Sequence, residues 1–210
     1  IQYQFHSQWF NLLAGSGIYR IDVDWSSRKK SSTNQIGCCE NFNRDKTNGY
    51  IYTNLNFNRN LNATVGFSYD SYQERKHTID GFNPKFGLQW NITDHLRLRM
   101  AWLETIKSPL TTQQTIEPTQ VAGFTQLFYD LNGTKSRRMG IGLDAHYENK
   151  IFSGLEISSR DLSVPDIAFS RIKFEDQKEN LYRWYIYGLL HKNWTAKSEV
   201  QFEEFSRAET

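Results

Sequence analysis

The chain switches regularly between two kinds of connection, and this rhythm constrains its fold more than any single motif. Segments of alternating polar and apolar residues are joined by a very short connection, then a long one, then a short one again. We expect the long connections at residues 26–47, 75–83, 107–136 and 164–180. Outer-membrane β-barrels sort their loops in this way, because one set of turns faces the periplasm and the other faces outside. The pattern therefore predicts a transmembrane β-barrel.

Ten segments fit this pattern, at residues 1–6, 9–25, 48–57, 62–73, 84–92, 96–105, 138–149, 151–163, 181–191 and 194–206. In the clearest segment, Leu98 and Met100 share one face of a strand, and Arg97 and Arg99 share the other. Most segments reach the roughly nine to eleven residues that a tilted strand needs to cross a bilayer. The segment at 9–25 changes phase partway, which predicts either a β-bulge near residues 19–20 or a strand that continues beyond the membrane.

The composition agrees with this fold class. Aromatic residues make up 15% of the chain and only four residues are proline, which favours strands. A mean hydropathy of −0.67 excludes transmembrane helices. A net charge of +2 is too small to indicate a nucleic-acid partner. Because the chain begins inside a strand and ends without a terminal aromatic residue, we expect an incomplete all-β, antiparallel barrel whose edge strands pair with the remainder of the polypeptide.

The sequence indicates no catalytic, cofactor or metal site. It carries no nucleophile elbow, no zinc-protease motif and no phosphate loop. Asp144 and His146 share the polar phase of one segment, with Ser158 as the obvious nucleophile, but a solvated network is the simpler interpretation. The only cysteines, Cys38 and Cys39, are adjacent and cannot easily reach disulfide geometry with each other. Free thiols, a strained bridge or an intermolecular bridge stay open.

Charged residues of the polar phase are the better functional candidates. Rings of charge inside a pore set its preference for ions and solutes. The same charges can instead pair across strands and hold the barrel together. We predict that the following residues line the lumen: Arg97, Arg99, Arg138, Asp144, Glu156, Arg160, Lys197 and Glu199.

The connection at residues 107–136 is the other candidate site. It has no clean strand period and is too long for a passive hairpin loop, yet it holds many apolar residues. We expect residues 115–129 to pack against the inner wall or the mouth and to restrict passage, with Phe124 and Phe128 as anchors. The predicted constriction comprises Glu117, Phe124, Phe128 and Tyr129. A surface lid that binds a ligand is the alternative.

Four stretches of the sequence carry a resemblance to a known family. They are QTIEPTQVAGF at 114–124, DLNGTK at 130–135, SRDLSVP at 159–165 and FNPKFG at 82–87. These stretches resemble the C-terminal barrel of bacterial outer-membrane proteins in which tetratricopeptide repeats precede a TonB-dependent-receptor-like barrel. The resemblance spans about residues 48–165. It implies an outer-membrane location and a β-barrel, and it implies no catalytic residues.

The predicted function is therefore passage or receptor-mediated uptake of a solute across the bacterial outer membrane, with membrane lipid as a partner. One alternative is export of a polymer such as a polysaccharide by a repeat-containing protein. Another is a soluble carbohydrate-binding β-sandwich whose aromatic residues stack on sugars. Strand length and the sorting of loops favour the membrane barrel.

Overall fold

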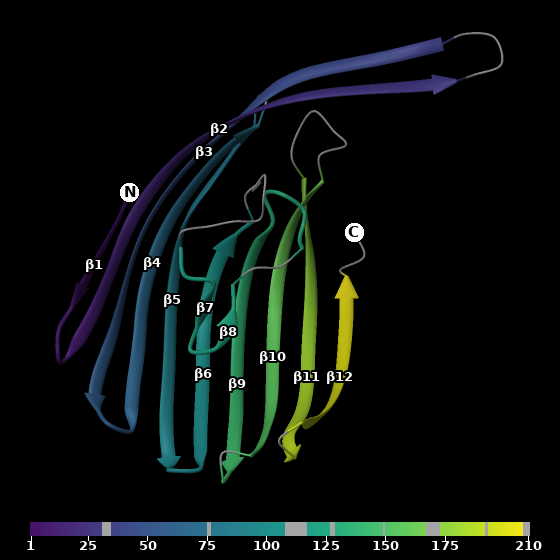
Figure 1. Cartoon of the computed structure of the whole chain (residues 1–210). Coiled ribbons are helices and arrows are strands. Elements are labelled where there is room, and N and C mark those ends of the chain that lie inside the picture. The colour runs from purple at the N-terminus through teal and green to yellow at the C-terminus, as the bar shows by residue number, and fades with distance from the viewer. Residues whose placement is uncertain are drawn as a thin grey trace.

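In the computed structural model the chain forms one ten-stranded antiparallel sheet (Figure 1). The structure describes residues 1–30, 35–74, 77–107, 117–126, 129–148, 150–166, 173–191 and 193–207, with their side chains except at positions 23, 25–30, 35–42, 74, 77 and 166. Among these residues, no helix is long and apolar enough to cross a membrane.

Each strand of the sheet pairs with its neighbour in chain order, and a small hairpin of β7 and β8 interrupts the series between β6 and β9. The strands are β1 Gln2–His6, β2 Phe10–Lys30, β3 Gln35–Asn58, β4 Leu61–Glu74, β5 His77–Thr93, β6 Leu96–Ile106, β7 Gln120–Val121, β8 Phe124–Thr125, β9 Lys135–Tyr147, β10 Ile151–Asp166, β11 Lys173–His191 and β12 Trp194–Arg207. The ten segments predicted from alternation correspond to the ten strands of the large sheet.

Three of the expected long loops are wrong in extent, because the strands run further than the alternating pattern indicated. The ladder between β2 and β3 continues to the pair Lys30–Gln35, β5 begins at His77, and β11 begins at Lys173. Backbone hydrogen bonds need no apolar face, so pairing continues where the side chains are polar. The β2–β3 ladder also has no register shift. The predicted bulge at residues 19–20 is therefore wrong, and the alternative, a strand that continues, is correct.

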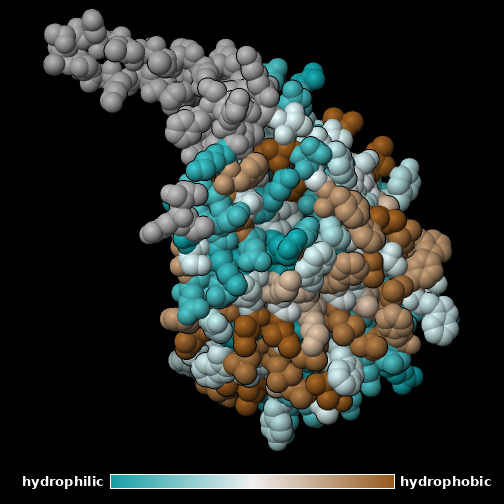
Figure 2. All heavy atoms as spheres, turned by 180° about the vertical axis from the view of Figure 1, so that it is seen from behind, coloured by the Kyte–Doolittle hydropathy of each residue, from teal (hydrophilic) through white to brown (hydrophobic). Residues whose placement is uncertain are grey.

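The outer face of the large sheet is apolar across its middle. One row of paired positions runs over five strands and consists of Leu98, Leu143, Leu155, Trp184 and Val200. Of these, Leu143, Leu155, Trp184 and Val200 are exposed. Figure 2, seen from behind relative to Figure 1, shows hydrophobic residues gathered over the lower half of the molecule and hydrophilic residues toward the long-loop end. The shared apolar phase predicted from the sequence is thus confirmed by the register.

Large aromatic residues gather on the outer face near the short turns. They are Phe57, Trp90, Tyr147 and Trp194, and all are exposed. Toward the long-loop end the same face becomes charged, where Arg137 Nε donates to Glu104 Oε1 at 2.8 Å. An apolar band flanked by aromatic residues is the outer surface of a transmembrane barrel.

The sheet is open, with β1 and β12 at its two edges. In the described residues no ladder joins these two strands, as predicted for an incomplete barrel. A soluble β-sandwich is excluded, because the ten strands form a single sheet and not two layers packed face to face.

Candidate functional site

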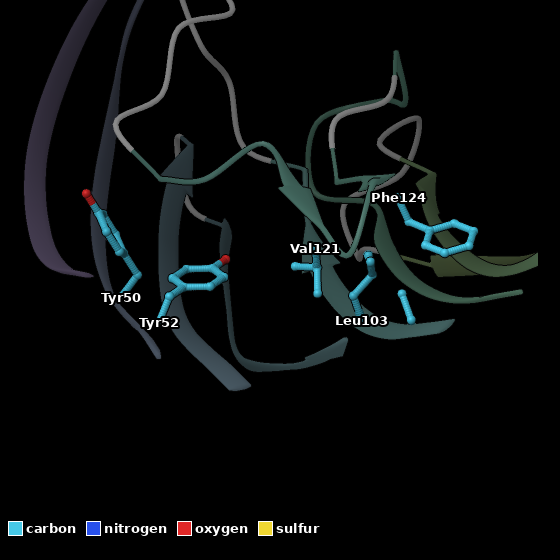
Figure 3. Close-up of a cluster of buried hydrophobic side chains, with 6 residues drawn as sticks. Tyr50, Tyr52, Leu103, Val121 and Phe124 are labelled. Carbon is cyan, nitrogen blue, oxygen red and sulfur yellow. The ribbon is translucent and has the colours of Figure 1, made fainter. Parts of the chain in front are cut away.

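The described residues 117–126 and 129–134 are named here the inner segment, and several of them contact the face opposite the apolar band. This inner face is the one that β7 and β8 cover in Figure 1. Val121 and Phe124 are each 1% exposed and join Tyr50, Tyr52 and Leu103 in one buried cluster (Figure 3). Residues on β3, β5, β6, β9 and β10 contact the same short segment, so the sheet curves around it.

A tight turn between β7 and β8 lets the inner segment contact the wall on both sides of the turn, through Val121 and Phe124. Ala122 and Gly123 have φ angles of 48° and 84°, and they connect β7 to β8. Within the described part, the backbone of residues 117–126 bonds to itself, for example from Gln126 N to Thr119 O at 2.8 Å. The polar contacts between this stretch and the sheet use side chains of the sheet, which reach side chains of the stretch and the carbonyl oxygen of Thr125.

Two glycines on the wall make room for the anchors of the inner segment. A Cβ atom built on Gly87 would lie 2.7 Å from Cγ1 of Val121, and one built on Gly140 would lie 2.3 Å from Cε1 of Phe124. Glycine weakens a strand interior, and here it permits close approach of another part of the chain. The polar phase of β5 and β9 is thus shaped for the segment.

Two guanidinium groups lie over the ring of Phe124. Cζ of Arg99 is 5.0 Å from the ring centroid and Cζ of Arg138 is 5.5 Å away. Arg138 also donates from Nη1 to the carbonyl oxygen of Thr125 at 3.1 Å. Cations over an aromatic face are attracted by its quadrupole, by about 2 kcal/mol when the pair is desolvated. Two strands of the wall thereby fix the same side chain.

Glu117 meets three donors of the wall. Its Oε1 accepts from Tyr52 Oη at 2.5 Å and lies 3.2 Å from Lys85 Nζ, while Asn48 Nδ2 donates to Oε2 at 3.5 Å. Tyr52 and Lys85 are 2% and 1% exposed. Gln126 adds a link, donating from Nε2 to Tyr52 Oη at 3.1 Å. A charge-assisted cluster therefore seats the start of the inner segment.

Arginine–carboxylate pairs continue along the wall beneath Phe124. Arg99 donates from Nε to Asp144 Oδ2 at 2.6 Å and from Nη2 to Asp144 Oδ1 at 3.0 Å. Arg138 donates from Nη2 to Glu156 Oε1 at 3.0 Å and to Ser158 Oγ at 2.9 Å. Tyr185 Oη also donates to Asp144 Oδ1, at 2.7 Å. A bidentate pair of this kind holds its geometry more firmly than a single contact.

A further pair ties the end of the inner segment to β10. Arg160 donates from Nη2 to Asp130 Oδ2 at 2.5 Å and from Nη1 to Glu179 Oε2 at 2.6 Å. Asp130 belongs to the inner segment and Glu179 to β11. The segment is therefore held near both of its ends by ion pairs.

All eight residues predicted to line a lumen lie on the inner face. Arg99, Arg138, Glu156 and Arg160 are buried, Asp144 is half-buried, and Arg97, Lys197 and Glu199 are exposed. Arg97 donates from Nε to Asn91 Oδ1, and Glu199 accepts from Arg183 and Lys197 on and beside the edge strand. Their role in solute preference stays a prediction.

The predicted constriction is placed only in part. Glu117 and Phe124 contact the wall, but Tyr129 is 90% exposed and does not pack against it. The expectation was wrong for Tyr129, because its side chain stays in solvent while the adjacent Asp130 makes the contact with Arg160. Phe128, the second predicted anchor, lies outside the described residues. The side chains of Cys38 and Cys39 lie outside them too.

Three residues of the site were not predicted as site residues. Tyr52, Lys85 and Asn48 occupy the polar phase of β3 and β5, and all three are buried. Alternation assigns these three residues to the inner face. It does not distinguish an inner-face residue that contacts the inner segment from one that faces solvent. Across the described side chains, no group of three His, Cys, Asp or Glu residues could hold a metal ion.

An antiparallel sheet with an apolar outer face, an aromatic girdle and a charged inner face is the wall of an outer-membrane β-barrel. Within that class, the chain belongs to the family described as TonB dependent receptor-like, beta-barrel, which it matches over residues 2–159. The chain is thus a bacterial outer-membrane protein, and the receptor-like part of the sequence resemblance is confirmed.

Solved structures of iron-uptake proteins share this fold. The ferric-catecholate import receptor Fiu of E. coli K12 has a TM-score of 0.69 at 10% identity, over 99% of this chain and 37% of that chain. The FrpB iron transporter of Neisseria meningitidis gives 0.70 at 12%, over 98% and 35%. The ferripyoverdine receptor of Pseudomonas aeruginosa gives 0.70 at 12%, over 98% and 32%.

These identities establish the fold alone. The chain spans about a third of the length of the structures that it matches. No curated protein sequence matches it.

Proposed function

We propose that this chain forms part of the wall of an outer-membrane barrel through which a solute is taken up, and that the inner segment restricts the passage. The observation that carries the proposal is the seating of Glu117 and Phe124 on the inner face, through buried donors of β3, β5, β6 and β9. A segment fixed there occupies space that a passing solute needs.

The receptor role is supported by similarity of fold. The structures with the same fold are described as a ferric-catecholate import receptor, an iron transporter and a ferripyoverdine receptor. We infer a solute-binding role of the same kind for this chain and assign it no catalytic activity. The eight residues predicted to line the lumen then contribute to solute preference through those of their charges that ion pairing leaves exposed.

The wider architecture is also a proposal. Residues 1–210 act as one barrel segment, whose partners are outer-membrane lipid, the solute and the remainder of the same polypeptide. The tetratricopeptide repeats, and with them export of a polymer such as a polysaccharide, stay predictions that rest on the sequence resemblance.

Replacement of residues 117–126 by a glycine–serine chain of equal length tests the restriction. This change keeps the length of the connection and removes its anchors. In the full-length protein, reconstituted into planar bilayers, single-channel conductance is expected to rise above that of the unaltered protein. Equal conductance, together with free cleavage of the unaltered segment by protease in intact cells, contradicts the proposal.

A further inference from the structure

The donors around Glu117, named here the carboxylate cradle, belong to the wall and not to the inner segment. Tyr52 Oη and Lys85 Nζ approach one oxygen at 2.5 Å and 3.2 Å, and Asn48 Nδ2 approaches the other at 3.5 Å. Each of the three donors is at least nine-tenths buried. The wall therefore carries a built site for a carboxylate, and the segment supplies the carboxylate that fills it.

The cradle is positioned by a second layer of polar contacts. Asn48 Nδ2 donates to Asp70 Oδ1 at 2.7 Å, and Asn83 Nδ2 donates to Asp70 Oδ2 at 2.8 Å. Lys85 Nζ donates to Ser68 Oγ at 2.6 Å and to the carbonyl oxygen of Asn83 at 3.2 Å. These contacts hold Asn48 and Lys85 on their strands independently of the inner segment, and the Tyr52 ring lies 5.6 Å from Lys85 Nζ.

The charge of Glu117 is the part of this arrangement that the wall does not supply. Ser68 Oγ and the Asn83 carbonyl are neutral acceptors of Lys85. The wall carboxylate Asp70 accepts from Asn48, Asn83 and Ser68 and lies 4.0 Å from Lys46 Nζ, whereas Glu117 is in direct contact with Lys85. A buried ammonium group is costly unless an anion balances it. A cradle without Glu117 is therefore expected to attract another carboxylate.

We propose that the cradle is a carboxylate-binding site for the solute, that Glu117 fills it in the resting protein, and that a solute carboxylate displaces Glu117 and frees the inner segment. This inference rests on the proposed function, because only a solute on the inner face reaches the cradle. It names the class of ligand as a molecule that bears at least one carboxylate. The contacts of Tyr52 and Lys85 then pass from the chain to the solute without loss of charge balance.

The first test measures ligand binding to an emptied cradle in the full-length protein. Glu117→Ala removes the resident carboxylate, and formate is the probe, with neutral formamide as its matched control. Formate is expected to raise the thermal unfolding midpoint of Glu117→Ala, and at a concentration ten times its dissociation constant to shift the folding equilibrium roughly tenfold. The double variant Glu117→Ala with Lys85→Met is expected to lose this response. Equal effects of formate and formamide overturn the site.

The second test measures displacement in a protein whose Glu117 is intact. A spin label at position 119, which is exposed in the inner segment, is placed in a Cys38→Ser, Cys39→Ser background. Formate is expected to increase label mobility and formamide is not. Glu104→Ala, which breaks a carboxylate–arginine pair on the outer face, is expected to leave the response unchanged.

The outcomes separate this inference from the proposed function. If formate stabilises Glu117→Ala but does not mobilise the intact segment, displacement is overturned. If Glu117→Ala fails to fold, Glu117→Gln keeps the side-chain volume without the charge, and a label as immobile as in the unaltered protein overturns the role of the cradle. The restriction itself is judged by the conductance of the glycine–serine replacement, which needs no carboxylate.

Discussion

The ring of Phe124 fills the space that a side chain on Gly140 would occupy, since a Cβ atom built there lies 2.3 Å from Cε1 of the ring. Gly140 belongs to the wall strand β9 and Phe124 to the inner segment. Arg99 and Arg138 lie over the same ring at 5.0 Å and 5.5 Å, so it has little freedom to move aside. Because Gly140 has no side chain, the ring of Phe124 can occupy this position on the wall.

Gly140→Ala is therefore expected to unseat the inner segment. The added methyl group overlaps the ring, and overpacking of this kind costs about 1–3 kcal/mol. Release of the segment is expected to raise single-channel conductance and the rate at which added protease cuts residues 117–134.

Gly49→Ala is the matched control. Gly49 lies in β3, and a Cβ atom built there meets nothing within 4 Å. The same substitution in another strand is expected to change neither conductance nor cleavage. Identical behaviour of the two variants contradicts the proposed seating of Phe124.

Neighbouring arginines on β9 are expected to differ sharply in their effect on stability. Arg138 is buried and bonded to Glu156 and Ser158, whereas Arg137 is exposed and bonded to Glu104 on the outer face. Removal of one partner of a buried pair costs about 3–5 kcal/mol, whereas loss of an exposed, solvent-screened pair has little effect on stability. Urea unfolding of Arg138→Ala and Arg137→Ala in detergent measures the difference, and equal losses contradict the assignment of the two faces.

The faces of the strands could be predicted from the sequence, because side chains alternate with a period of two. Leu143 and Asp144 fall on opposite faces for that reason alone, whatever the loops do. The extent of the strands could not, since backbone pairing continues past the apolar band into polar stretches such as residues 173–180. Hydrophobic alternation indicates which side chains face an apolar environment. It does not indicate where the backbone ladder of a strand ends.

The site could be predicted in part for a related reason. The apolar content of residues 115–129 indicates a packed segment, and Phe124 is the more buried of its two aromatic residues that the structure describes. The positions that receive it, such as Gly140 and Lys85, are separated from it in sequence and are chosen by the register of several strands. A single sequence gives no signal for such pairs, which is why the carboxylate cradle was not predicted.

Depth along the outer face can be tested with one strand. Leu143 lies in the middle of the apolar band, and Tyr147 lies in the aromatic girdle four residues along the same face of β9. Arginine costs about 2–4 kcal/mol at the bilayer midplane and about 0–1 kcal/mol near the interface. Unfolding in lipid vesicles is expected to show a large loss for Leu143→Arg and a small one for Tyr147→Arg. The reverse order contradicts the orientation of the sheet.

The edges of the sheet predict how the full-length barrel closes. β1 and β12 each pair on one side only within the described residues, and unpaired backbone groups in lipid cost several kcal/mol each. Additional strands of the polypeptide are therefore expected to cover both edges. In a Cys38→Ser, Cys39→Ser background, a short thiol cross-linker is expected to join position 184 to position 200, which are direct neighbours, and not position 3 to position 200. Efficient linkage of Tyr3→Cys to Val200→Cys contradicts this, because it requires that the ten strands close directly on one another.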